Sequence, residues 1–204
     1  GGVLRVPVAE GVVETWERIL STGEGADVTI ACKGGCQPAE LRAHATVLRS
    51  ASKVLRAMLS PAFREGSTAR VEVDFDAAAV RLLLSVIYTG EEVDEAEAPA
   101  DSLLAAVELA HQWDVGHAVT ALEVAVVRRI DDERFGRATE VAARLQLPQL
   151  TPACMAFAKN SADVKKRFKA SQYPPGVQAL LAKVFGDAES GESRRKRRRL
   201  IMAT

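Results

Sequence analysis

The chain has 204 residues, with 27 Lys and Arg against 27 Asp and Glu, so its formal charge at pH 7 is zero. A chain of this length buries about 70% of its unfolded surface and needs no disulfide to hold a core. Its cysteines, Cys32, Cys36 and Cys154, give neither an even disulfide framework nor a Cys-x-x-Cys ligand pair, and no apolar run reaches the roughly 18 residues of a membrane span. We therefore expect a soluble intracellular protein with reduced thiols. Because the sequence begins at Gly1 with no signal-like segment, we also expect the natural chain to extend upstream.

Charge is unevenly distributed along the chain. Residues 194–199, RRKRRR, supply 6 of the 27 basic groups, which leaves 21 against 27 acidic groups and a net charge of −6 elsewhere. A polyanionic partner is therefore not expected for the folded part. Residues 187–204 are polar, charged and rich in small side chains, and they are predicted to be disordered.

The first predicted element is an amphipathic helix that begins near residue 11. Val12, Trp16 and Ile19 share one helical face, with Val13 and Leu20 beside it, and two glycines then end the pattern. After it, alternating apolar residues and a turn-prone stretch predict a β-hairpin, which is followed by two short helices and a third strand. These elements are expected over residues 27–32, a run ending near Leu41, 45–50, 52–60 and 71–75.

The rest of the chain predicts helices, because apolar residues recur at spacings of three and four. An acidic loop, 91–100, precedes a helix that Asp101 or Ser102 is expected to cap. The helices are expected over residues 80–87, from the cap to about 111, 115–126, 133–146 and 149–159, with a looser pair on either side of 174–176.

Five stretches of sequence resemble, in register, the BTB/POZ domain family: 27-DVTI-30, 41-LRAHATVLRSASKVLRAML-59, 71-VEVDF-75, 82-LLLSVIYTG-90 and 103-LLAAVELAHQWDV-115. The lead-in 14–28 resembles the linker between a MATH domain and a BTB domain, and 130–160 resembles the helical extension, called the 3-box or BACK start, of cullin-binding members. The resemblance implies an α+β fold, a helical cluster capped by a short β-sheet, followed by an all-helical extension. It implies a linker and dimerisation helix over 1–24, a BTB/POZ domain over 25–130, the extension over 131–186 and a disordered basic tail over 187–204.

Within this family, His44 marks the passage from the hairpin to the helices, and the resemblance implies a packed, hydrogen-bonded structural residue. A lone histidine lacks the partners that general-base catalysis or metal binding requires, and His111 and His117 are not expected to supply them. We expect no catalytic residue, cofactor or metal.

Many relatives place Lys or Arg after the Ala-His pair to balance a buried aspartate matching Asp27, but this chain has Ala45. Either Asp27 is solvated here, or another base such as Arg42 or Arg49 reaches it.

Two surfaces are expected to bind other polypeptides. The resemblance implies that the first helix packs across a two-fold partner to form a homodimer; the alternatives are a helix folded back on its own domain or one packed on an upstream domain. Phe63-Arg64-Glu65 fits the pattern with which cullin-binding relatives insert an apolar side chain into the scaffold, with a carboxylate setting register, unless Phe63 fills the core and Glu65 is merely solvated. Trp113 falls where relatives present a tyrosine to the same partner, or else it is a core indole. The dimer-interface residues expected are Val12, Trp16, Ile19 and Leu20, and the cullin-binding residues are Phe63, Glu65 and Trp113.

The expected function is that of a non-enzymatic substrate adaptor for a cullin-RING ubiquitin ligase, with the ubiquitination substrate bound by a domain outside these residues. The alternatives are a nuclear transcriptional or chromatin co-regulator and a purely structural oligomerisation module. The basic run resembles a nuclear import signal that an importin would bind, so we expect the protein in the nucleus, the cytoplasm or both. We expect no membrane contact and no sequence-specific nucleic-acid binding, since zinc-finger spacing and interleaved aromatics are missing. The import signal consists of Arg194, Arg195, Lys196, Arg197, Arg198 and Arg199.

Overall fold

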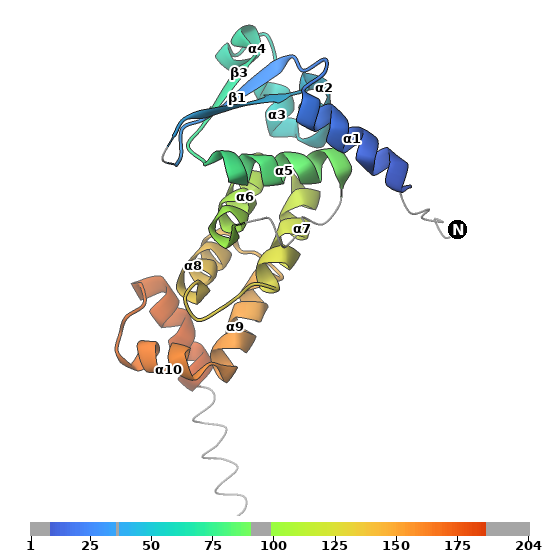
Figure 1. The fold of residues 1–204 in the computed structure, drawn as a ribbon. Coiled ribbons are helices and arrows are strands. Elements are labelled where there is room, and N and C mark those ends of the chain that lie inside the picture. Colours follow the sequence, from blue (N-terminus) through green and yellow to red (C-terminus); the bar gives the residue numbers. More distant parts are fainter. Residues whose placement is uncertain (1–8, 36, 91–98, 187–204) are drawn as a thin grey trace, which may run out of the picture. The chain divides into compact units, whose positions relative to one another are not determined.

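The structure is a computed structural model, and it describes residues 9–35, 37–90 and 99–186 (Figure 1). The chain divides into two compact units, residues 1–125 and 126–204. The first unit contains α1 (Glu10–Thr22), β1 (Val28–Cys32), β2 (Ala39–Ala43), α2 (Ala45–Ala51), α3 (Lys53–Met58), α4 (Arg64–Thr68), β3 (Arg70–Val73), α5 (Ala77–Thr89), α6 (Ala100–Gln112) and most of α7 (Gly116–Val127). The second contains α8 (Phe135–Leu145), α9 (Leu150–Asn160), α10 (Ala162–Lys169) and a further helical stretch over 175–186.

The sheet of the first unit has three strands in the order β2-β1-β3. β1 and β2 form the predicted antiparallel hairpin, with Val28 opposite Ala43 and Cys32 opposite Ala39. β3 lies parallel to β1 on its other side, and the helices α2, α3 and α4 make the crossover that a parallel pair requires. β2 is therefore an edge strand.

α5 lies at the centre of the first unit and packs against α1, α2, α6 and β2 (Figure 1). Its apolar residues include Val80, Leu83 and Leu84, which are at most 1% exposed. Asp76 caps the helix by accepting a hydrogen bond from the Ala79 N–H at 2.6 Å. Gly90 ends it with a φ of 70°, a left-handed conformation that glycine adopts without strain.

The second unit has its own core. Phe135, Val141 and Leu150 are buried, as their spacing predicts, and Leu145 and Phe157 are half-buried. Phe135 stacks on Phe157 with ring centroids 5.8 Å apart. This unit therefore has an apolar interior that does not depend on a disulfide, and Cys154 within it is free.

Two local predictions differ from the structure. The capping residue of α6 is Pro99, whose side chain makes no capping hydrogen bond, so the expectation that Asp101 or Ser102 caps this helix is wrong. The helix begins directly after the extended Pro99, and the Ser102 hydroxyl donates instead to the Asp76 carboxylate at 3.4 Å. The short helix α4 was not predicted, because its five residues are too few to show an apolar period.

No helix within the described ranges has the length and apolar character that a bilayer crossing requires.

Candidate functional site

Helix α1 has apolar residues on two adjacent sides, and these lie in different environments. Val13 is 5% exposed and belongs to the side that packs on α5. Val12 and Trp16, on the neighbouring side, are 47% and 38% exposed, while Ile19 and Leu20 are half-buried. The helix is therefore docked on its own unit and still presents an apolar strip, which we call the α1 strip and define as Val12, Trp16, Ile19 and Leu20.

The Tyr88 hydroxyl joins α1 to the start of α2. The aromatic ring of Tyr88 contacts the Trp16 ring edge-on, with ring centroids 6.1 Å apart. The Tyr88 hydroxyl oxygen accepts a hydrogen bond from the backbone N–H of His44 at 2.8 Å. The His44 Nε2 lies 2.8 Å from the Glu24 carbonyl, which can only accept, so Nε2 carries the proton and Nδ1 accepts the Tyr88 O–H at 2.7 Å. Burial raises the pKa of the Tyr88 phenol, which keeps this donor protonated. His44 is thus a hydrogen-bonded structural residue, as predicted.

Replacing Tyr88 by Phe is expected to lower the free energy of unfolding by about 1–3 kcal/mol, because it leaves the His44 N–H and Nδ1 without a partner. Urea denaturation followed by circular dichroism measures this. Tyr173→Phe is the matched control, since the buried Tyr173 hydroxyl has no hydrogen-bond partner among the described residues. Equal losses from the two variants would contradict the role given to the Tyr88 hydroxyl.

Asp27 is exposed, so its charge needs no buried counter-ion. Its carboxylate accepts the Ala45 N–H at 2.7 Å, at the first residue of α2. The Arg42 guanidinium donates to the Ala26 carbonyl at 2.7 Å, and neither Arg42 nor Arg49 pairs with Asp27 among the described residues. Of the two alternatives, solvation is therefore the one that the structure shows.

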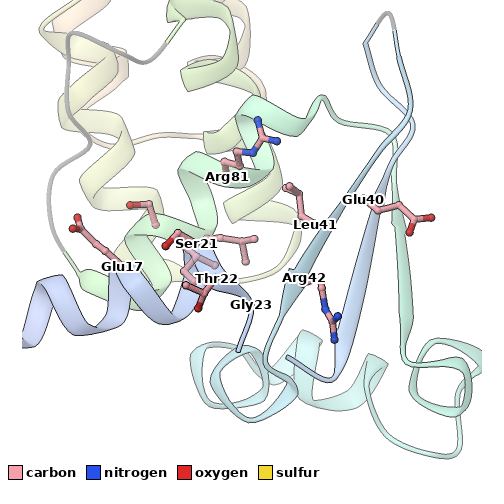
Figure 2. Close-up of a pocket in the computed structure, with 11 residues that line it drawn as sticks. Glu17, Ser21, Thr22, Gly23, Glu40, Leu41, Arg42 and Arg81 are labelled. Carbon is pink, nitrogen blue, oxygen red and sulfur yellow. The ribbon is translucent and has the colours of Figure 1, made fainter. Parts of the chain in front are cut away.

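A groove of about 740 Å³ lies between α1, β2 and α5 (Figure 2). Leu41 on β2 turns toward α5, whereas Glu40 turns to the other side of the strand and pairs with Arg70 at 2.8 Å. The groove is lined by apolar side chains, such as Leu20 and Leu41, together with charged groups of both signs. Its lining consists of Glu17, Leu20, Ser21, Thr22, Gly23, Glu40, Leu41, Arg42, Arg81, Leu84 and Ser85. Tyr88 and Arg81 were missed from the sequence as contributors to these surfaces, although both lie in or beside the 82–90 stretch that resembled the family.

Phe63 is 54% exposed and directly precedes α4, of which Glu65 is the second residue. The alternative that Phe63 fills the core is therefore removed. The Glu65 carboxylate lies 3.8 Å from the Arg64 guanidinium and is partly shielded, with 29% of its side chain exposed. An exposed aromatic side chain with a carboxylate two residues further along the chain is typical of a recognition element. We call Phe63, Arg64 and Glu65 the Phe63 surface.

The backbone that carries the Phe63 surface folds tightly on itself. The Phe63 N–H donates to the Ser60 carbonyl at 3.0 Å, and the Ser67 N–H donates to the Phe63 carbonyl at 3.0 Å. A Cβ atom at Gly66 would overlap the Ser60 carbonyl group, so only glycine fits this position. The main chain thus sets the direction of the Phe63 Cα–Cβ bond.

Trp113 is not on the surface. Its indole is 1% exposed, and its carbonyl accepts the Ser52 hydroxyl, which in turn accepts the N–H groups of Val54 and Leu55 at the start of α3. The prediction that Trp113 contributes to cullin binding is wrong, because its place at the end of α6 ties it to the interior. The core alternative is the correct one.

The described residues contain no cluster of three or more His, Cys, Asp or Glu side chains placed to hold a metal ion. His111 and His117 are exposed, on α6 and α7 respectively. The basic residues 194–199 lie outside the described residues, and so does most of the acidic loop, 91–98.

Cys154 is a buried thiol in the second unit. Burial raises its pKa to about 11, so about one thiol in a thousand is ionised at pH 8. Cys154 is therefore expected to resist iodoacetamide in the native protein at pH 8 and to react fully in urea, as peptide mass spectrometry would show. Equal labelling rates in the two conditions would show that the thiol is accessible and its pKa ordinary.

The sequence model of the BTB/POZ domain matches residues 17–130, which is more than half of the chain. A search of curated proteins finds no match.

Proposed function

The chain belongs to the BTB/POZ family, whose domains are protein–protein interaction modules, and on this premise we propose that it is a dimeric substrate adaptor of a cullin-RING ubiquitin ligase. The ligase chemistry belongs to the partners in this proposal, and the chain supplies binding surfaces alone. The α1 strip would contact a second copy, and the Phe63 surface would contact the cullin scaffold. The exposure of Phe63 is the observation that carries the proposal.

The second unit supports the cullin contact in this proposal. Its helices α8 and α9 follow the family domain directly and correspond to residues that resemble the 3-box or BACK extension of cullin-binding members. The lead-in that resembles a MATH–BTB linker suggests that the substrate-binding domain precedes these residues. Recovery of a cullin scaffold protein with the purified chain, compared between native and Phe63-surface variants, tests the proposal.

A second candidate function is that of a nuclear co-regulator, and the basic run 194–199 favours it. Adjacent like charges that cannot pair with one another remain free to bind an acidic importin groove. A fluorescent reporter fused to residues 187–204 is expected to concentrate in the nucleus, as imaging would show, and replacing residues 194–199 by Gln is expected to spread it evenly. A native fusion that is already evenly spread would remove the import signal from the proposal.

A further inference from the structure

The two units carry opposite charges. Residues 126–204 contain 17 of the 27 basic groups and 8 of the 27 acidic groups, a net charge of +9, which leaves −9 on residues 1–125. The excess is not confined to the basic run, because residues 126–186 alone contain 11 basic and 5 acidic groups. The value of −6 obtained outside 194–199 is therefore an average over an acidic unit and a basic one. The charge argument against a polyanionic partner for the folded part therefore does not apply to the second unit.

Part of this charge forms one face of α10. Val164 is buried and Phe168 is half-buried, and these two residues, four apart, define the inner side of the helix. Lys165, Lys166 and Lys169 are exposed, and the helical period of 3.6 residues places them within about 100° of one another on the outer side. We call these lysines the α10 face. Lys159 on α9 and Lys183 in the 175–186 helix are exposed as well.

The fold does not neutralise the α10 face. Asp163 pairs with Arg167 at 2.6 Å, Asp131 pairs with Arg134, and Asp132 accepts the Ser161 hydroxyl, so these carboxylates are engaged elsewhere. No lysine of the α10 face forms an ion pair among the described residues. Lys165 and Lys169 are one turn apart, where like charges destabilise a helix. Lys166 and Lys169 lie in the last turn of α10, where cations interact favourably with the helix dipole, and an external anion would relieve the repulsion that remains between Lys165 and Lys169.

The rest of the second unit indicates which anion fits. The large hydrophobic side chains exposed in the described residues are Val12, Trp16, Val54 and Phe63, all of them in the first unit. Residues 126–186 thus offer no large exposed apolar anchor for a protein hot spot or for insertion into a lipid surface. Their aromatic rings are half-buried or buried, and Phe168 packs on Phe185 with centroids 5.0 Å apart, so none is free to stack on unpaired bases. The phosphate backbone of a duplex nucleic acid requires cations alone.

We propose that the α10 face binds the phosphate backbone of a duplex nucleic acid without sequence preference. The acidic first unit is repelled by the same polyanion, so binding is expected through the second unit. Each lysine that neutralises a phosphate releases counter-ions, which makes the affinity strongly dependent on salt.

Fluorescence anisotropy with a labelled duplex DNA of about 30 base pairs tests this proposal on the full chain. The variant Lys165→Gln/Lys166→Gln/Lys169→Gln is expected to weaken binding about tenfold or more at 0.1 M salt and to reduce the slope of log affinity against log salt by about 0.9 for each lysine removed. The matched control, Arg18→Gln/Arg49→Gln/Lys53→Gln, removes the same charge from exposed positions of the first unit and is expected to change affinity less than about twofold. Both triple variants are repeated with residues 194–199 replaced by Gln, so that the tail does not hide the effect.

Two further results keep the test decisive. Lys165→Arg/Lys166→Arg/Lys169→Arg keeps the charge and is expected to retain native affinity and the native melting curve. The proposal is overturned if the Gln variant loses no more affinity than its control, if the Arg variant loses as much as the Gln variant, or if the protein with a neutral tail does not bind duplex DNA. Binding to anionic vesicles or polyglutamate as tight as to the duplex would also overturn it, in favour of a general polyanion surface.

Discussion

Changing Phe63 to Ala and Glu65 to Lys together is expected to weaken the binding of a cullin scaffold at least about 30-fold, which corresponds to about 2 kcal/mol. The ring is already 54% exposed in the free chain, so removing it takes little from the fold. The loss arises in the complex, where the ring would be buried and the carboxylate would face a complementary charge. Co-purification and calorimetric titration with the scaffold measure the effect.

The control for this prediction is Glu24→Lys, which reverses one charge at an exposed position between α1 and β1. It is expected to bind the scaffold as the native chain does. Unaltered binding by the Phe63→Ala/Glu65→Lys variant would move the contact to another surface. Failure of the native chain itself to bind any cullin scaffold would favour the co-regulator or the oligomerisation module.

Trp16→Asp is expected to convert a dimer into a monomer. A carboxylate at the centre of the α1 strip would have to be desolvated against apolar side chains of the second copy, which costs several kcal/mol and raises the dissociation constant at least about 100-fold. Light scattering after size exclusion should give twice 21.9 kDa for the native chain and 21.9 kDa for the variant at the same concentration.

Arg18→Asp provides the control on the same helix. Arg18 is exposed, and the helical period places it on the side away from Trp16, so this variant is expected to remain dimeric although it changes the charge by two units. Circular dichroism shows whether both variants keep their helices. A native chain that is already monomeric would contradict the role of the α1 strip.

The order of the helices and strands could be predicted because local residues, above all Gly and Pro, mark where the helices end. Gly23 and Gly90 end α1 and α5 with φ values of 63° and 70°, where other residues would be strained. Pro61 follows the helix α3, and Pro148 separates α8 from α9. The alternation in 27–32 and 71–75 likewise marks two strands, although only the tertiary structure shows that they pair in parallel.

The inward or outward direction of a side chain was harder to predict than its secondary structure. Val12 and Val13 are neighbours of the same type, yet they are 47% and 5% exposed, because the position of α5 decides which side of α1 is covered. Trp113 was misplaced for the same reason. Its environment depends on Ser52, which is 61 positions away in the sequence, and no local pattern reveals that contact.

The close packing of Gly66 against the Ser60 carbonyl, which holds the backbone around Phe63, has a consequence for binding kinetics. When a ligand-contacting ring lies on a flexible loop, binding must order that loop. The conformational entropy lost in this step lowers the affinity and slows association. Here the main chain at Phe63 is already held by the hydrogen bond from its N–H to the Ser60 carbonyl and by the one from the Ser67 N–H to its own carbonyl, so only the side-chain torsions of the ring remain to be ordered. A partner can therefore bind without first ordering this backbone, and its residence time will depend on the contacts made rather than on refolding of the loop.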